Sequence, residues 1–238
     1  TILQNNTGIL EEILPRVNVL YRPKIANVTK VIIVMANDKP APSLMLLDKL
    51  LLLTHYFGIS PLILLNKCDL SADKNAVELK QYYPAAGFDF IMVSAKTKMG
   101  INLLAKAIKD HIAVFAGPSG SGKSSLLNVL ADGLQIKTQE VSTKIGRGKH
   151  TTRHVELYWL KTGGWIADTP GFSLIDIPPV NSHELADFYP DFKTPALNCR
   201  FNNCLHHNEK DCGVKKFVED GIIKQLLKRQ FRAGVLKS

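Results

Sequence analysis

Cysteines are scarce in this sequence and long apolar segments are absent, and each absence excludes a class of protein. Four cysteines in 238 residues do not form the disulfide framework of a small secreted protein. No apolar run reaches the roughly 18 residues of a membrane-spanning helix. The opening residues TILQNNTG also lack the basic start and cleavage site of a secretory signal. We therefore expect a cytoplasmic protein without membrane association, and we expect a monomer.

Acidic side chains are outnumbered by basic ones, which gives a formal net charge of +9. Residues 137–153 and residues 207–238 each carry a net charge of +4, so two segments hold 8 of the 9 excess charges. A solvated basic surface would account for the charge alone. The clustering, however, suggests a polyanionic partner.

Predicted strands alternate with predicted helices through the middle of the sequence. Continuous apolar runs at 30–38 and 61–70 are typical of parallel strands covered on both faces, and a helix is expected between them at 43–58. Further strands are expected at 88–96, 111–120, 154–160 and 163–171, and further helices at 73–84, 101–111 and 122–133. This alternation predicts the α/β class, with an open, doubly wound and mostly parallel sheet.

The only phosphate-loop motif, GPSGSGKSS, lies between a predicted strand and a predicted helix. Its glycines let successive N–H groups face a bound anion, and the helix adds the positive end of its dipole. Lys123 is expected to reach the β- and γ-phosphates, and the Ser124 hydroxyl to ligate Mg²⁺. The motif residues are Gly117, Pro118, Ser119, Gly120, Ser121, Gly122, Lys123 and Ser124. This motif does not distinguish ATP from GTP.

A second motif, Asn66-Lys67-Cys68-Asp69, follows another predicted strand and is typical of a guanine-binding loop. The Asp69 carboxylate can accept hydrogen bonds from N1–H and the 2-amino group of guanine. Adenine offers neither donor, so the carboxylate would be left unpaired. Asn66 is expected to brace the loop and face the base, and the stem of Lys67 to lie along the base plane.

The triplet Ser94-Ala95-Lys96 also comes just past a predicted strand. In GTPases such a triplet supplies a backbone N–H to guanine O6, and here that N–H would be the one of Ala95. Its presence strengthens the interpretation of residues 66–69 as a guanine-binding loop.

Two further segments are typical of the switch regions of GTPases. Asp168 follows a predicted strand and is expected to hold Mg²⁺ through water, while the Gly171 N–H would sense the γ-phosphate. The segment 146–154 offers two hydroxyls, those of Thr151 and Thr152. One of them is expected to reach Mg²⁺ when GTP is bound, and we favour Thr152.

The glutamine that orients water in Ras-like enzymes is missing. Its place after the DxxG glycine is taken by Phe172, whose ring cannot hydrogen-bond water as an amide does. His150 is the candidate within this chain for that catalytic role. A histidine that only faces phosphate or RNA is the alternative.

The guanine-binding motifs precede the phosphate loop, the reverse of the usual order in GTPases. Ligands of doubly wound sheets bind to the loops at the carboxyl ends of the strands. Cutting a surface loop and joining the old termini leaves those loops in place. The order therefore predicts a circularly permuted GTPase.

Four soft ligands for a metal lie within 14 residues: Cys199, Cys204, Cys212 and a histidine between them. Three thiolates and one imidazole can close a tetrahedral zinc site. The spacing leaves His206 and His207 open as the fourth ligand. We interpret the site as a structural one.

The sequence resembles the circularly permuted small-ribosomal-subunit biogenesis GTPases of the bacterial RsgA type. The resemblance rests on the permuted motif order together with GRGKHTTRH, DTPGF and C-x4-C-x-H-x5-C. The resemblance implies residues 66–69 and 117–125, Ser125 included, as the nucleotide site, His206 as the zinc ligand and His150 as the catalytic histidine. It also implies a remnant of an N-terminal OB-fold at 1–27, a GTPase domain at 28–190 and a zinc-binding, α-rich module with a basic helical tail at 191–238. Most of the OB-fold of that family is absent from this sequence.

By this resemblance the protein is expected to bind GTP and GDP with Mg²⁺, to carry one structural Zn²⁺, and to bind the small ribosomal subunit and its rRNA late in maturation. The subunit is expected to stimulate GTP hydrolysis, after which the protein leaves. The alternative is an RNA-binding module in which guanine nucleotide regulates binding with negligible turnover. A small-molecule kinase would prefer ATP, which Asp69 argues against.

Overall fold

The computed structural model describes residues 12–13, 15–21, 24–131, 155–168 and 189–221. Within this part of the chain, one six-stranded sheet has the order β5-β4-β3-β6-β8-β7. Its strands are β3 (Lys30–Ala36), β4 (Ser60–Asn66), β5 (Phe90–Met92), β6 (Ile112–Ala116), β7 (Glu156–Trp159) and β8 (Trp165–Asp168). All neighbouring pairs are parallel except β7–β8, so the sheet is mostly parallel, as the alternating pattern predicted.

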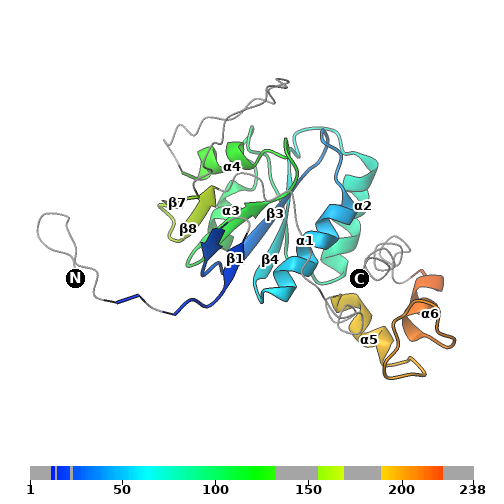
Figure 1. The fold of residues 1–238 in the computed structure, drawn as a ribbon. Helices are drawn as coiled ribbons and strands as arrows, with labels where there is room; N and C mark the ends of the chain where they lie inside the picture. Colours follow the sequence, from blue (N-terminus) through cyan, green and yellow to red (C-terminus); the bar gives the residue numbers. More distant parts are fainter. Residues whose placement is uncertain (1–11, 14, 22–23, 132–154, 169–188, 222–238) are drawn as a thin grey trace, which may run out of the picture.

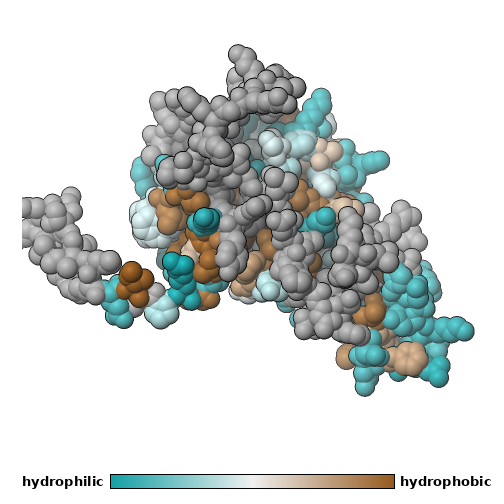
Figure 2. Space-filling view, viewed as in Figure 1, coloured by the Kyte–Doolittle hydropathy of each residue, from teal (hydrophilic) through white to brown (hydrophobic). Residues whose placement is uncertain are grey.

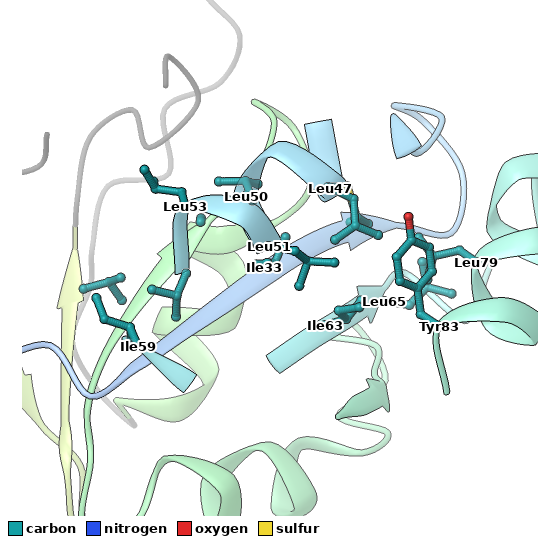
Figure 3. Close-up of a cluster of buried hydrophobic side chains, with 14 of the residues drawn as sticks. Ile33, Leu47, Leu50, Leu51, Leu53, Ile59, Ile63, Leu65, Leu79 and Tyr83 are labelled. Atoms are coloured by element: carbon teal, nitrogen blue, oxygen red, sulfur yellow. The ribbon is translucent and has the colours of Figure 1, made fainter. Parts of the chain in front are cut away.

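Helices cover both faces of the sheet (Figure 1). They are α1 (Leu44–Tyr56), α2 (Lys74–Ala85), α3 (Ile101–Ile108) and α4 (Lys123–Leu130). Side chains of β3 alternate between the two faces because successive residues of a strand point in opposite directions. Ile33 packs with α1 and α2 in one apolar cluster, and Ile32 packs with α3 and α4 in another. Figure 3 shows the first cluster, in which Leu47 and Tyr83 from the two helices meet Ile63 and Leu65 of β4.

Local sequence accounts for the ends of these helices. Ser43 accepts a hydrogen bond from the Leu46 N–H at the start of α1, and Asp73 accepts one from the Asn75 N–H at the start of α2. Such side-chain caps satisfy amide groups that have no partner inside the helix. None of the helices in the described residues is long and apolar enough to cross a membrane.

Two smaller units flank the sheet. Before it, β1 (Val19–Tyr21) and β2 (Lys24–Ala26) form an antiparallel pair. After it comes the C-terminal module, which we define as residues 189–221, with η2 (Pro190–Phe192), α5 (Lys193–Ala196) and α6 (Gly213–Glu219). Figure 2 shows hydrophilic residues gathered over this module at the lower right.

The C-terminal module packs against α1 and α2, far from β7 and β8 (Figure 1). Leu52 of α1 shares an apolar cluster with Phe192 of the module, and Tyr82 of α2 borders that cluster. The Tyr82 hydroxyl also donates a hydrogen bond to the Asp191 carboxylate. The module is therefore joined to the half of the sheet that carries the predicted guanine-binding loop.

Candidate nucleotide site and metal centre

The two predicted nucleotide-binding motifs lie at the same edge of the sheet. The phosphate loop follows β6, and the loop Asn66–Asp69 follows β4. Only β3 separates these strands, and all three are parallel. The carboxyl ends of parallel strands meet at one edge, so the fold brings motifs about 50 residues apart in sequence next to each other.

The phosphate loop depends on glycine at two places of close approach. Gly117 has φ of 131°, and a Cβ there would lie 2.2 Å from the carbonyl oxygen of Val34 in β3. Gly122 has φ of 95°, and a Cβ there would lie 2.3 Å from Nδ2 of Asn66. At these φ angles, and with contacts this short, no residue with a Cβ fits, so both positions need glycine. These glycines thus let the loop lie tightly against β3 and against the base-binding loop.

Lys123 lies over the phosphate loop. Its Nζ donates hydrogen bonds to the carbonyl oxygens of Gly117 (2.9 Å) and Pro118 (2.8 Å). Lys123 and Ser124 open α4, so the N–H groups of the first turn of this helix face the loop. The arrangement concentrates positive charge and N–H donors where phosphates would bind.

Asn66 joins the two motifs directly. Its Nδ2 donates to the carbonyl oxygen of Ser121 in the phosphate loop (2.9 Å), and its Oδ1 accepts from the N–H of Ala95 (3.1 Å). The side chain is buried, with 1% of its surface exposed. One amide therefore fixes three segments that are distant in sequence and that were all predicted to bind nucleotide.

Ala95 has a contact that the sequence did not predict. That its N–H faces guanine O6 stays a prediction, and in the structure this N–H donates to Oδ1 of Asn66. The physical reason is that the buried Asn66 amide oxygen needs a donor, and this backbone amide is within reach. A guanine O6 would have to share or take over this N–H.

Asp69 stands exposed beside Ser94. The Ser94 hydroxyl donates to Oδ1 of Asp69 at 2.6 Å. This hydrogen bond, followed by smaller effects of nearby charges that include Lys96 and Lys67, lowers the pKa of the Asp69 carboxyl. The carboxylate is thus kept ionised and oriented, as two-donor recognition of guanine requires.

Lys67 and Cys68 complete the base-binding loop. Lys67 has a left-handed backbone with φ of 63°, and its Nζ donates to the carbonyl oxygen of Lys39 at 2.5 Å. The Cys68 N–H donates to the carbonyl oxygen of Val93, and burial raises the pKa of its half-buried thiol. Cys68 therefore supports the loop and stays protonated.

The residues predicted to bind Mg²⁺ and to act in hydrolysis are only partly described. Asp168 ends β8, next to β6, so its backbone lies at the nucleotide edge of the sheet. Ser124 lies in the first turn of α4. His150, Thr152 and Gly171 lie outside the described residues.

The four predicted zinc ligands come together in the C-terminal module. One ligand atom each from Cys199, Cys204, His206 and Cys212 lies within 4.8 Å of all the others. The distances are 3.9 Å between the sulfurs of Cys199 and Cys212, and 3.5 Å and 3.4 Å from these sulfurs to Nδ1 of His206. A tetrahedral zinc ion with ordinary bond lengths sets sulfurs about 3.8 Å apart and sulfur about 3.5 Å from nitrogen. The group can hold a metal ion, and its spacing matches that of zinc.

The surroundings of this centre act in both directions on the ionisation of its thiols. Cys212 is the N-cap of α6, and its sulfur accepts a hydrogen bond from the Lys215 N–H at 3.4 Å. Burial raises the pKa of Cys204 to about 12, and burial lowers the pKa of His206. A bound cation would offset the cost of ionising such crowded thiols.

One residue at the nucleotide edge was missed by the sequence reasoning. Asn37 directly follows β3, and its Nδ2 donates a hydrogen bond to the carbonyl oxygen of Leu70, the residue after the base-binding loop. Its signal was a polar residue just past a buried strand, but it stands in no recognisable motif.

Comparison with known proteins agrees with this geometry. The family model described as RsgA GTPase matches residues 13–178. A relative from Alkaliphilus metalliredigens named "Small ribosomal subunit biogenesis GTPase RsgA" is 44% identical over 221 residues, which cover 93% of this chain and 76% of the relative. One of the same name from Moorella thermoacetica is 45% identical over 216 residues, covering 91% and 74%.

Two solved structures share the fold. The crystal structure of YjeQ from Thermotoga maritima is 31% identical, with a TM-score of 0.81, and the match covers 98% of this chain and 80% of that one. The crystal structure of YloQ, described as a circularly permuted GTPase, is 32% identical, with a TM-score of 0.77, covering 95% and 73%. The predicted permuted GTPase fold is thereby confirmed.

Proposed function

This chain belongs to the RsgA GTPase family, and from that premise we propose that it hydrolyses GTP as a late assembly factor of the small ribosomal subunit. The predicted family and enzyme class are confirmed by the comparisons. The ribosomal role rests on the names of relatives that are similar over nine tenths of this chain. The protein would act as a cytoplasmic monomer.

The proposal of one nucleotide site is supported chiefly by the hydrogen bonds of the Asn66 amide. They connect Ser121 of the phosphate loop with Ala95 beside the base-binding loop. One guanine nucleotide can span the two loops only if they lie next to each other. The same contact gives Gly122 its role, because any side chain there would displace Asn66.

We assign roles to the chain's residues on this basis. Asp69 selects guanine, held by Ser94, while Lys123 and the first N–H groups of α4 bind the phosphates. Ser124, Asp168 and Thr152 would hold Mg²⁺, which neutralises charge on the phosphates when bound. His150 would orient the attacking water, and the Gly171 N–H would detect the γ-phosphate.

We propose that the metal of the Cys199, Cys204, His206 and Cys212 group is one structural Zn²⁺. The four protein ligands leave no open position for a reactant, as in structural sites. This ion would fix a zinc-binding domain, for which we propose the bounds 191–238, after a GTPase domain at 28–190 and an OB-fold remnant at 1–27. The basic segments at 137–153 and 207–238 would contact rRNA by neutralising phosphate charge.

A GTPase assay with and without small ribosomal subunits tests the proposal. We expect subunits to raise turnover by about tenfold or more, and His150→Ala to lower the stimulated rate by about 100-fold if it acts on water. Guanine nucleotide binding without stimulation would refute the enzyme-on-subunit proposal in favour of a nucleotide-regulated RNA-binding module. Unchanged stimulated turnover in His150→Ala would remove only the assignment of that residue.

A further inference from the structure

Asn37 lies at the nucleotide edge of the sheet without belonging to a nucleotide-binding motif. It directly follows β3, the strand between the phosphate loop and the base-binding loop. Only 1% of its surface is exposed. A buried amide at the end of a central strand needs partners, and these define what it holds in place.

Three hydrogen bonds connect Asn37 to the chain around the base-binding loop. Its N–H donates to the carbonyl oxygen of Asn66 at 2.7 Å, and its Nδ2 donates to the carbonyl oxygen of Leu70, also at 2.7 Å. Its own carbonyl oxygen accepts from the N–H of Asp73 at 2.8 Å. Asn37 therefore holds Asn66, the first residue of the loop Asn66–Leu70, through its backbone, and Leu70, the last residue, through its side chain.

The orientation of the Asn37 side chain follows from these contacts. The Leu70 carbonyl can only accept, so the NH₂ end of the amide must face it. Oδ1 is then buried, and no hydrogen-bond partner for it exists among the described residues. Leaving a buried amide oxygen unpaired costs free energy. The hydrogen bond that the NH₂ group donates to Leu70 is therefore the contact that accounts for an amide side chain at this position.

The base-binding loop needs such fastening because its backbone is strained. Lys67 has a left-handed backbone, which is unfavourable for a residue with a side chain. On the β5 side, the loop is held by Ser94, which donates to Asp69, and by Val93, which accepts from the Cys68 N–H. On the β3 side, its ends are held by Asn37.

Residues near Asn37 extend this support toward the phosphate loop. The carbonyl oxygen of Lys39 accepts from Nζ of Lys67, and that of Pro42 accepts from Nδ2 of Asn75 at 3.0 Å. A Cβ placed on Gly120 would lie 3.5 Å from Cδ of Pro40. The segment 37–42 thus contacts the base-binding loop through Lys39 and helix α2 through Pro42, and its Pro40 lies near Gly120 of the phosphate loop.

We propose that Asn37 is a positioning residue for guanine recognition: by holding the ends of the loop Asn66–Leu70 from β3, it sets the Asp69 carboxylate where both guanine donors reach it. This inference rests on the proposed guanine site. It adds a residue outside the known motifs, and it predicts that base selectivity depends on a side chain that does not touch the base.

The test compares the affinities of GDP, IDP and ADP for the zinc-loaded chain by isothermal titration calorimetry. Inosine lacks the 2-amino group, so the ratio of the IDP and GDP dissociation constants reports how well Asp69 receives both donors. In the wild type we expect IDP to bind roughly tenfold more weakly than GDP. Asn37→Asp places a carboxylate against the Leu70 carbonyl and should weaken GDP binding about tenfold, with the ratio falling below about three.

A matched control is Thr54→Val. Thr54 is equally buried and donates to the carbonyl oxygen of Leu51 inside α1, so its loss removes one buried hydrogen bond without touching the base-binding loop. This variant should lose stability and keep the wild-type ratio. Asn37→Ser, whose shorter side chain cannot reach the Leu70 carbonyl, gives the same readout should Asn37→Asp not fold.

The outcomes separate the two proposals. A wild-type ratio in both Asn37 variants would overturn the role of Asn37 and leave the guanine site intact. Equal affinity of the wild type for GDP, IDP and ADP would refute the guanine site itself. A reduced ratio in the Asn37 variants alone, with Thr54→Val unchanged, supports the proposal.

Discussion

Asp48 should make the stability of this protein fall as the pH rises. The carboxyl lies inside α1 with 3% of its surface exposed, and Oδ1 accepts a hydrogen bond from the Tyr83 hydroxyl at 2.6 Å. Burial raises its pKa to about 7, more than the hydrogen bond from Tyr83 lowers it, and the nearby Asp191 carboxyl adds to the rise. In the unfolded chain the group titrates near 3.8. Between these two values the folded state keeps a proton that the unfolded state has lost, so the free energy of unfolding decreases with pH.

The magnitude follows from the width of that window. One pKa unit corresponds to about 1.4 kcal/mol, so from pH 5.5 to pH 7 the wild type should lose about 2 kcal/mol of stability through Asp48. Above pH 7 this loss levels off. Asp48→Asn keeps an oxygen for the Tyr83 hydroxyl but cannot ionise, so this part of the pH dependence should vanish.

Denaturant unfolding of the zinc-loaded protein at pH 5.5 and pH 8 measures the effect. The difference between Asp48→Asn and the wild type should be about 2 kcal/mol larger at pH 8. Burial also raises the pKa of Asp191, which is present in both proteins, so only its coupling to Asp48 enters the comparison. Asp89→Asn, at an exposed position, is the control and should follow the wild-type profile. Parallel profiles for Asp48→Asn and the wild type would show that Asp48 is ionised in the folded protein, against this reasoning.

Three further substitutions probe the two sites. Gly122→Ala puts a Cβ 2.3 Å from Nδ2 of Asn66, at a φ of 95°. The affinity for GDP, measured by calorimetry, should therefore fall by at least about 100-fold. Near wild-type binding would contradict the close packing of the two loops. Asp69→Asn should weaken GDP binding by about 100-fold and favour xanthosine diphosphate, whose 2-oxo group accepts from an amide; unchanged nucleotide choice would contradict guanine recognition by this residue. Cys204→Ser should abolish stoichiometric zinc in metal analysis and lower the melting temperature. Cys68→Ser is the control and should retain the metal. Full zinc content in Cys204→Ser would refute the ligand set.

Some of the site could be predicted from sequence because its residues act through local backbone geometry. The glycines of the phosphate loop, the strand before it and the helix after it are neighbours in the chain, so a short motif specifies them together. The same holds for Cys199, Cys204, His206 and Cys212, which a compact turn brings within reach of one metal. Spacing could not choose between His206 and His207; in the structure it is His206, with a left-handed backbone, whose Nδ1 lies at the sulfurs of Cys199 and Cys212.

Other features were missed or predicted only in part. The sequence assigned the Ala95 N–H to the base, which stays a prediction, but it gave no sign that this N–H pairs with Asn66, 29 residues earlier in the chain. The strand expected at 88–96 is shorter, Phe90–Met92, because the chain then turns to bring Ser94 to Asp69. No periodicity or motif encodes contacts of this kind, since they depend on which strands become neighbours.

The sequence by itself determined which chemical groups stand together in short motifs. These are a phosphate-loop motif, an Asn-Lys-x-Asp motif typical of guanine binding and a cluster of soft metal ligands, each within about 15 residues. Only the tertiary structure decided how these parts meet. It brings Asn66 to Ser121 across 55 residues and packs the C-terminal module on α1 and α2. The physical reason is that short-range backbone preferences fix each motif, whereas burial of apolar faces between strands and helices fixes which motifs become neighbours.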